Sequence, residues 1–239
     1  MTTKVNKNLD FTELHERMDW YVNEGVIPFV STLVLEGDDV LDQSFHGSAD
    51  HASEQPLNAE TIFRMHSSTK IVCSIAAMTL WEQGGFKLDD PLEKFMPEFG
   101  GMQVLKANAT AIDETEPAQS SILIKQIMSH TAGFSYGFIE PNSVIDTAYG
   151  AHGLNSFAPE AELTLESMCK RLGALPLVYQ PGTFWRYSFA TDVLARLIEV
   201  ISGQRFDEYL KETIFEPLKM HDTDFYVPEE KLDRLSTMY

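Results

Sequence analysis

The sequence predicts an α+β protein, and three observations lead to that prediction. Runs of β-forming residues cluster near the N-terminus, helical periodicity dominates the rest of the chain, and no regular strand–helix alternation is present. This pattern disfavours a doubly wound parallel sheet. The chain has 239 residues, of which 44% are hydrophobic. That is enough apolar material for one large domain or two closely joined lobes.

The N-terminal part predicts a helix followed by a β-hairpin. Asp10 can cap a helix whose apolar residues recur every three or four positions. Two β-forming runs then flank a turn-forming stretch around Gly37. We therefore divide the chain into residues 1–60, the helix and hairpin of a sheet lobe, and residues 61–239, a mainly helical lobe.

The second part alternates helical patterns with loops. Helices are expected over residues 67–83, 120–131, 163–175, 190–203 and 205–218. Residues 100–120 carry few apolar anchors and predict a surface loop. Residues 135–160 are rich in Gly, Pro, Asn and Ser and predict a long loop over a site.

Composition excludes several classes of protein. Acidic residues outnumber basic ones 36 to 18, so a nucleic acid or an anionic membrane would be repelled. No long apolar run or signal-peptide pattern occurs, which favours the cytoplasm. Cys73 and Cys169 fit no metal-ligand spacing and lie among apolar helical neighbours, so buried free thiols are expected. We expect no metal and no cofactor.

A serine and a lysine three positions apart, Ser67 and Lys70, begin a predicted helix directly after an extended run. Residues three apart share a helix face, so the lysine can reach the serine hydroxyl. Apolar neighbours would strip water from the lysine and lower its pKa, which favours the neutral amine that can act as a base. The alternative is a capping serine with a surface lysine. The chain has a second such pair, Ser167 and Lys170, but its position in an amphipathic helix turns both outward.

Tyr187 supplies a second proton carrier. It follows a Pro-Gly turn and precedes a long amphipathic helix, and Lys70 could lower its pKa by stabilising the phenolate. The alternative is a core aromatic. The segments "FRMHSSTK", "IMSHTAGF" and "PGTFWRYS", in this order, resemble the serine β-lactamase and penicillin-binding-protein superfamily. The likeness is closest to class C β-lactamases and family VIII carboxylesterases.

The resemblance implies an antiparallel sheet flanked by helices, joined to a helical lobe. It also implies that Ser67 is the nucleophile, that Lys70 is the lysine of the Ser-x-x-Lys motif, and that Tyr187 is the tyrosine of the Tyr-x-Asn motif. Phe189 stands where that motif has asparagine, which contacts the amide of the lactam side chain in β-lactamases. We therefore expect an esterase acting through an acyl-enzyme on small-molecule esters. β-Lactam hydrolysis, acyl transfer and a non-catalytic penicillin-binding-like module are the alternatives.

Two further features complete the sequence-based expectations. The segment "GFSYG" fits the nucleophile elbow of α/β-hydrolases around Ser135, but it lacks the preceding strand and following helix; Phe134 or Tyr136 could touch substrate there instead. The resemblance also calls for C-terminal sheet strands and a Lys-Thr-Gly-like motif, which do not occur after Tyr187. We therefore expect these strands to be missing from this chain, and a second polypeptide piece or a C-terminal region to complete the fold.

Overall fold

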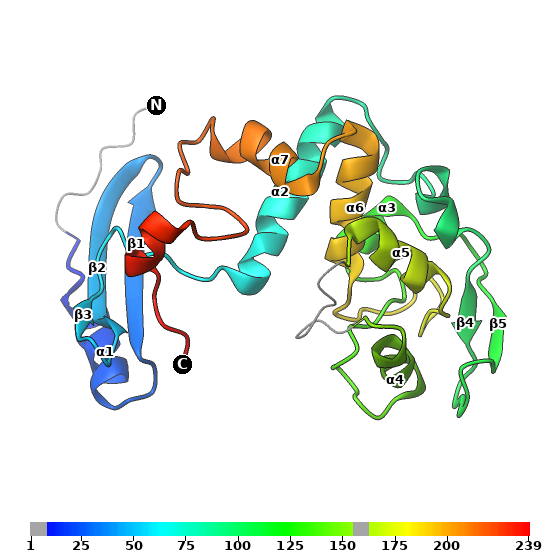
Figure 1. Ribbon diagram of the computed structural model, residues 1–239, viewed down its shortest axis with the longest axis horizontal. Coiled ribbons are helices and arrows are strands. Elements are labelled where there is room, and N and C mark those ends of the chain that lie inside the picture. Colours follow the sequence, from blue (N-terminus) through cyan, green and yellow to red (C-terminus); the bar gives the residue numbers. More distant parts are fainter. Residues whose placement is uncertain (1–8, 155–162) are drawn as a thin grey trace. The chain divides into compact units, whose positions relative to one another are not determined.

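The computed structural model describes residues 9–154 and 163–239, and it confirms the α+β class (Figure 1). The chain forms two compact units. The first comprises Met1–Met65 with Asp224–Tyr239, and the second comprises His66–Thr223. No helix within the described residues is long and apolar enough to cross a membrane.

The first unit is built from helix α1 (Thr12–Asn23) and a three-stranded antiparallel sheet. Strands β1 (Phe29–Glu36), β2 (Asp39–Asp50) and β3 (Gln55–Pro56) lie in sequence order. Gly37 turns the chain between β1 and β2 with a φ of 63°, a conformation that glycine adopts without steric cost. The predicted helix and hairpin are therefore both present.

Polar contacts join α1 to β2. The Nε2 atom of His15 lies 2.9 Å from a carboxylate oxygen of Asp42, and Nδ1 of His46 lies 2.6 Å from Oδ1 of Asp19. No residue of α1 is fully buried. The helix therefore adheres to the sheet through side-chain hydrogen bonds and partly covered apolar residues.

The C-terminal segment returns to the first unit. Leu235 forms a parallel bridge to Ile62, whose N–H donates to the carbonyl of Arg234 at 2.8 Å. The Thr237 N–H donates to the carbonyl of Ala49 at 2.9 Å. The sequence division assigned this segment to residues 61–239, whereas in the structure its backbone pairs with the N-terminal residues.

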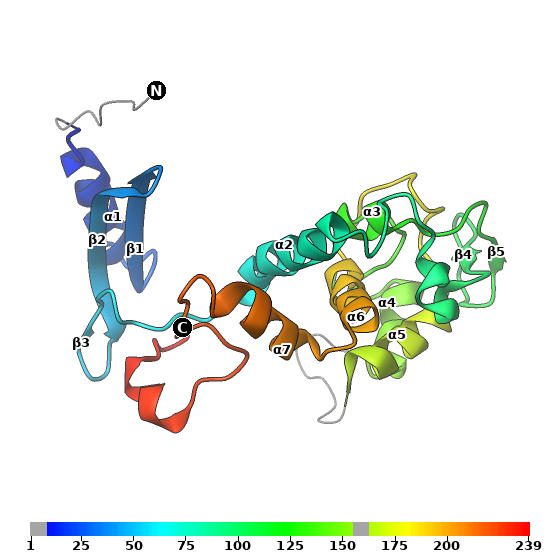
Figure 2. The ribbon, with the colours of Figure 1, turned by 90° about the horizontal axis from the view of Figure 1, so that it is seen from above.

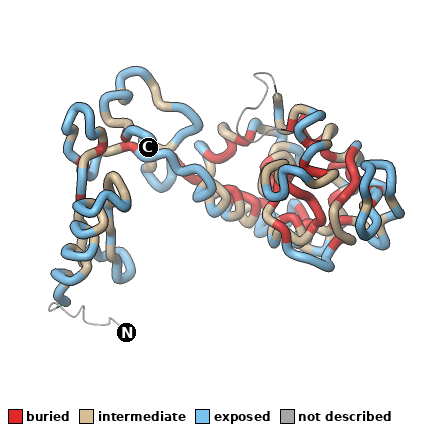
Figure 3. The backbone as a smooth tube through the Cα atoms, turned by 90° about the horizontal axis from the view of Figure 1, so that it is seen from below, coloured by how far each residue is buried: buried red, intermediate tan, exposed pale blue. Residues whose placement is uncertain are grey.

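The second unit is mainly helical and contains most of the fully buried side chains (Figure 3). Its helices are α2 (Thr69–Glu82), α3 (Ile124–Met128), α4 (Val144–Ala151), α5 (Leu165–Gly173), α6 (Ala190–Ser202) and α7 (Phe206–Leu210). A π-helical turn, Lys211–Phe215, continues α7. Helix α6 lies at the centre, packed against α2, α3, α5 and α7 (Figures 1 and 2).

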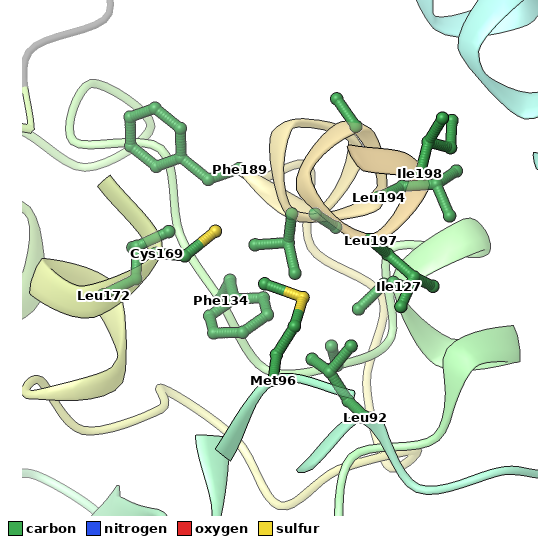
Figure 4. Close-up of a cluster of buried hydrophobic side chains, with 14 of the residues drawn as sticks. Leu92, Met96, Ile127, Phe134, Cys169, Leu172, Phe189, Leu194, Leu197 and Ile198 are labelled. Carbon is green, nitrogen blue, oxygen red and sulfur yellow. The ribbon is translucent and has the colours of Figure 1, made fainter. Parts of the chain in front are cut away.

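The core of this unit surrounds the apolar side of α6. Val193, Leu194 and Leu197 are at most 1% exposed. Figure 4 shows Leu194 and Leu197 among side chains from other helices and loops. The helix ends at Gly203, which adopts a left-handed conformation with a φ of 73°. The amphipathic pattern and the C-terminal glycine predicted this helix correctly.

Two predicted loops contain regular structure. Residues 100–120 include the hairpin of β4 (Gln103–Leu105) and β5 (Thr115–Pro117), and the segment from 135 to 154 includes α4. The strands are too short to show a period of two, and β4 is completed by a parallel bridge from Val104 to Leu177. Tertiary partners therefore created strands that the local pattern did not indicate. The remainder of the second predicted loop, residues 155–162, lies outside the described residues.

Candidate active site

Ser67 lies at the junction between an irregular segment and α2. Residues His66–Ser68 form a short 3₁₀ turn, and α2 begins at Thr69. His66 has a φ of 42°, which is uncommon for a residue with a side chain. Such backbone strain persists only where surrounding structure holds it, and it concentrates at functional sites. Ser67 itself is exposed at this position.

The packing of α2 explains why Ser67 is held firmly. The buried residues of α2 are Cys73, Ala76, Ala77 and Leu80, spaced as one helix face. This face packs against α6, which carries its own buried stripe. The start of α2 is therefore fixed by the core while Ser67 remains accessible.

Lys70 lies one turn after Ser67. Its Nζ atom is 3.5 Å from the Ser67 Oγ, and it lies 4.9 Å from the ring centre of Tyr187 and 5.5 Å from that of Tyr136. The side chain is partly buried. The sequence predicted a lysine among aliphatic residues, but two phenol rings form its surroundings. Both rings are close enough for cation–π attraction to the ammonium group.

Tyr187 approaches Ser67 from the segment that precedes α6. Its Oη atom lies 2.8 Å from the Ser67 Oγ, across 120 residues of sequence. Partial burial acts to raise the pKa of Tyr187, but hydrogen bonds with Lys70 and Ser67 and the charge of Lys70 outweigh it. The pKa of Tyr187 is therefore below its ordinary value, in the direction expected from the sequence. The structure thus brings Ser67, Lys70 and Tyr187 together.

Backbone hydrogen bonds hold the Tyr187 segment in place. The Arg186 N–H donates to the carbonyl of His130 at 2.9 Å, and the Phe189 N–H donates to the carbonyl of Ser135 at 3.1 Å. His130 has a φ of 55°, a second strained position beside the site. Tyr187 is therefore fixed between two bonds to the same neighbouring loop.

His130 also approaches Tyr187 through its side chain. The two ring centres are 5.1 Å apart, and Nδ1 of His130 lies 3.2 Å from the Ser188 Oγ. Burial lowers the pKa of His130, and the positive charge of Lys70 lowers it further. The sequence analysis did not single out this histidine. Its occurrence in the "SHTAGF" segment gave no signal that the ring would reach Tyr187.

Tyr136 and Asp192 complete the surroundings of Lys70. The Tyr136 ring stacks on Tyr187, with centres 5.3 Å apart and planes inclined by 16°. Its Oη donates a long hydrogen bond, 3.4 Å, to Oδ2 of Asp192. Burial raises the pKa of Asp192, while the charge of Lys70 opposes that shift. Sequence reasoning named Tyr136 only as a possible substrate contact and missed Asp192, whose place in the first turn of α6 resembled an ordinary helix-start acid.

Two aromatic residues take other roles than the sequence suggested. Phe189, which stands in the place of the motif asparagine, is only 5% exposed and stacks on Tyr136 with ring centres 4.5 Å apart. Phe134, named as a possible substrate contact, is 1% exposed and packs against Phe99. Both are core residues, because the loop and α6 close over them. Phe189 therefore packs against the Tyr136 ring and helps to fix its position.

Ser135, which the sequence disfavoured as a nucleophile for lack of a flanking strand and helix, is fully buried. Its Oγ donates to Oδ1 of Asp146 at 2.5 Å and accepts from Nε of Arg186 at 2.9 Å. Arg186 also pairs with Glu140 at 3.4 Å. Ser135 is 0% exposed, and its hydroxyl is part of a buried polar network beneath the Tyr136 and Tyr187 segments. A nucleophile needs access to substrate, which this serine lacks.

The second serine–lysine pair lies on a helix surface. Ser167 is part of a capping box at the start of α5, where its N–H donates to Oγ1 of Thr164. Lys170 is exposed and pairs with Glu166. The prediction that this pair is structural is confirmed. Cys73 and Cys169 are both buried and free, also as predicted, and burial raises the pKa of the Cys73 thiol to about 12.

No cluster of three or more potential metal-ligating side chains occurs within residues 9–154 and 163–239. The site has instead the composition of a serine hydrolase: an exposed hydroxyl, a phenol in hydrogen-bond contact and a lysine within reach of both. The family comparison agrees with this class. The Beta-lactamase family model matches residues 13–239, and the chain belongs to that family.

Individual relatives place the chain near esterases. It is 34% identical to Protein Rv1367c of Mycobacterium tuberculosis over 90% of this chain and 52% of that protein. It is 26% identical to Esterase EstB of Burkholderia gladioli over 93% of this chain and 54% of the esterase. The solved structure of EstCE1, described as a hydrolase with promiscuous acyltransferase activity, has a TM-score of 0.81 and 28% identity, covering 95% of this chain and 55% of that one. The chain thus spans about half the length of these relatives.

Proposed function

We propose that the chain carries the nucleophile site of a serine hydrolase that cleaves small carboxylic esters through an acyl-enzyme. The observation that carries the proposal is the 2.8 Å contact between the Ser67 Oγ and the Tyr187 Oη, with Lys70 Nζ 3.5 Å from the same serine oxygen. A nucleophilic hydroxyl needs a nearby base, and this geometry supplies one.

In the first step of this mechanism, Ser67 Oγ bonds to the ester carbonyl carbon while its proton passes to the phenolate oxygen of Tyr187. The carbonyl oxygen takes the negative charge of the tetrahedral intermediate. Collapse of that intermediate re-forms the carbonyl and breaks the bond to the alcohol oxygen, which takes the proton from Tyr187. The alcohol leaves, and the acyl group stays on Ser67 as an ester.

The second step returns the enzyme to its starting state. Water gives a proton to Tyr187 and bonds to the acyl carbon, and Ser67 recovers its proton as the carboxylic acid departs. Lys70 stabilises the phenolate before and after each transfer, because its positive charge lies beside the Tyr187 ring. In this mechanism Ser67 is the nucleophile, Tyr187 carries the proton, and Lys70 stabilises the phenolate form of Tyr187.

Acyl transfer is the second candidate function, and the likeness to EstCE1 favours it. An alcohol in place of water at the second step would yield a new ester with the same residues in the same roles. β-Lactam hydrolysis receives less support, because Phe189 occupies the asparagine position of the motif and its ring is directed into the core.

Labelling with a fluorophosphonate tests the proposal directly, because this reagent bonds only to activated serines. We expect the label on the peptide that contains Ser67, and we expect Ser67→Ala to abolish both labelling and cleavage of a short-chain p-nitrophenyl ester. Ser167→Ala is the matched control, since that serine also precedes a lysine by three positions but lies on a helix surface. Unchanged labelling of Ser67→Ala would refute the assignment. A wild-type chain that stays unlabelled even when a C-terminal region completes the fold would support a non-catalytic module.

A further inference from the structure

Asp192 is a carboxylate that the mechanism above does not use, although it lies against the reacting residues. It belongs to the first turn of α6, three positions after Phe189. Phe189 fills the place of the motif asparagine with a buried ring. Residues three apart share a helix face, so Asp192 supplies a polar side chain near the position from which the asparagine is absent.

Contacts from two other segments define where the Asp192 carboxylate lies. Its Oδ2 accepts the 3.4 Å hydrogen bond from Tyr136, whose ring faces the Lys70 ammonium at 5.5 Å. The first turn of α6 also meets α2 through Cys73, whose Sγ donates to the carbonyl of Thr191 at 3.7 Å. The carboxylate is therefore held near α2 and the Tyr136 loop in a partly buried position.

Around Lys70, two of the neighbouring groups, Tyr136 and Cys73, are kept neutral by burial. Burial raises the pKa values of Tyr136 and Cys73, and the negative charge of Asp192 raises each further. Neither group therefore becomes an anion that would compete with Asp192 for Lys70. The positive charge of Lys70 acts in turn to lower the pKa of Asp192. Asp192 and Lys70 are thus opposite charges in a partly buried setting, where their attraction is stronger than in water.

We propose that Asp192, together with the Tyr136 ring, positions the Lys70 ammonium between the two phenol rings so that it faces Tyr187 and Ser67. This inference rests on the proposed function. Asp192 and Tyr136 are positioning residues here: they act through Lys70 and do not bond to the ester. The ionised carboxylate is the active form, because only a negative charge attracts the ammonium.

Five titratable side chains of the described residues interact electrostatically with Asp192. They are Lys70 and Cys73 on α2, Tyr136 on its loop, Tyr187 before α6 and the Cys169 thiol on α5. His130 lies beyond Tyr187 and also feels Lys70. Burial raises the pKa of Asp192, so the carboxylate takes up a proton above the pH of about 3.9 that is ordinary for aspartate. The reactivity of Ser67 should therefore fall as the pH drops through the raised pKa of Asp192.

The test measures the second-order rate constant of fluorophosphonate labelling at Ser67 as a function of pH, with the intact chain. We expect Asp192→Asn, which keeps the shape and removes the charge, to slow labelling about 10- to 100-fold at neutral pH and to abolish the acidic fall. Asp192→Glu should recover part of the rate. Tyr136→Phe, which keeps the ring and loses the hydroxyl, should lose less than Asp192→Asn.

Controls separate positioning from folding and from other titrations. His130→Gln removes a histidine near the site that could also titrate at acidic pH. The labelling rate of this variant should still fall at acidic pH. Asp207→Asn, at the start of α7 and paired with Arg205, is the matched surface carboxylate and should label at the wild-type rate. Thermal unfolding of Asp192→Asn should be close to wild type. If that variant does not fold, Asp192→Glu decides: an acidic fall that is shifted from its wild-type position supports the proposal, and a fall identical to wild type overturns it.

The outcomes also separate this inference from the proposed function. Labelling of Asp192→Asn at the wild-type rate with the same acidic fall would overturn the positioning role while Ser67 remained the nucleophile. Labelling that persisted in Ser67→Ala would overturn both.

Discussion

Tyr187 lies in contact with the nucleophile candidate, and its hydroxyl has a separate function from its ring. The ring stacks on Tyr136 and lies 4.9 Å from Lys70, whereas the Oη reaches the Ser67 Oγ. A change that removes only the oxygen therefore separates chemistry from packing.

Tyr187→Phe should slow acylation of Ser67 about 10²- to 10⁴-fold, because general acid–base assistance is lost while the ring still packs. Pre-steady-state measurement of p-nitrophenol release reports this step. Tyr226→Phe, at a 69% exposed position, is the control and should react normally. A near-normal rate for Tyr187→Phe would reduce Tyr187 to a packing role.

The lowered pKa of Tyr187 predicts an optical signal. Its hydrogen bonds and the Lys70 charge favour the phenolate, so half of Tyr187 should be ionised at a pH below the ordinary value of about 10. The phenolate absorbs near 295 nm, and the difference between wild type and Tyr187→Phe isolates this one residue during a pH titration. Deprotonation only above pH 10 would contradict the proposed phenolate base.

At the scale of elements, α6 combines the core of the second unit with one wall of the site. Its buried stripe faces α2, α3 and α5, and its N-terminal residues Phe189 and Asp192 adjoin Tyr136. Packing defects in this helix should therefore affect both stability and the site. Two substitutions test its ends separately.

Phe189→Asn would restore the motif asparagine but should not produce β-lactamase activity. The ring is 5% exposed, so its loss should cost about 3 kcal/mol or more in the free energy of unfolding, with an added cost for burying an amide. Urea denaturation measures the loss, and Phe189→Leu should lose less. Rapid nitrocefin hydrolysis by the asparagine variant would show that position 189 can reach substrate.

Gly203→Ala should destabilise the second unit by about 1 kcal/mol. The residue has a φ of 73°, which a side chain disfavours, although an added Cβ would meet no atom within 4 Å. Gly150→Ala in α4 is the matched control, because it also has open space but ordinary helical backbone. That change should stabilise by roughly 0.5–1 kcal/mol. Thermal unfolding of both variants should therefore shift in opposite directions.

At the scale of the whole molecule, residues from both ends of the chain share one unit. The Ile62 N–H donates to Arg234, and Ser236 donates back to the Ile62 carbonyl at 2.9 Å. Within the other unit, the Leu92 N–H donates to Ile122 at 2.7 Å. These two amides report independently on the two units.

Deleting residues 228–239 should accelerate hydrogen exchange at the Ile62 amide, because its acceptor is removed. The Leu92 amide should keep its protection, since both of its partners remain. Exchange followed by NMR resolves the two positions. Equal acceleration at Leu92 would show that the segment stabilises the whole chain.

Local sequence patterns determined much of the fold and singled out the residues of the candidate site. The periodicity of residues 190–203, the N-terminal hairpin and the surface position of Ser167 were all predictable, because each depends on residues within a few turns or one strand pair. Ser67, Lys70 and Tyr187 were predictable as candidates because their motifs are local. The proximity of Ser67 and Lys70 followed from helix spacing, whereas the assignment of Tyr187 to the same site followed from resemblance.

Tertiary structure alone decided which side chains surround those candidates. Asp192 and His130 lie beside Lys70 and Tyr187 because helix packing and a strained loop bring distant segments together, and no local spacing encodes such contacts. Phe189 became a core residue for the same reason. The hairpin of β4 and β5 likewise depends on a long-range partner at Leu177. Short-range periodicity specifies an element, whereas burial and charge at a site depend on what packs against it.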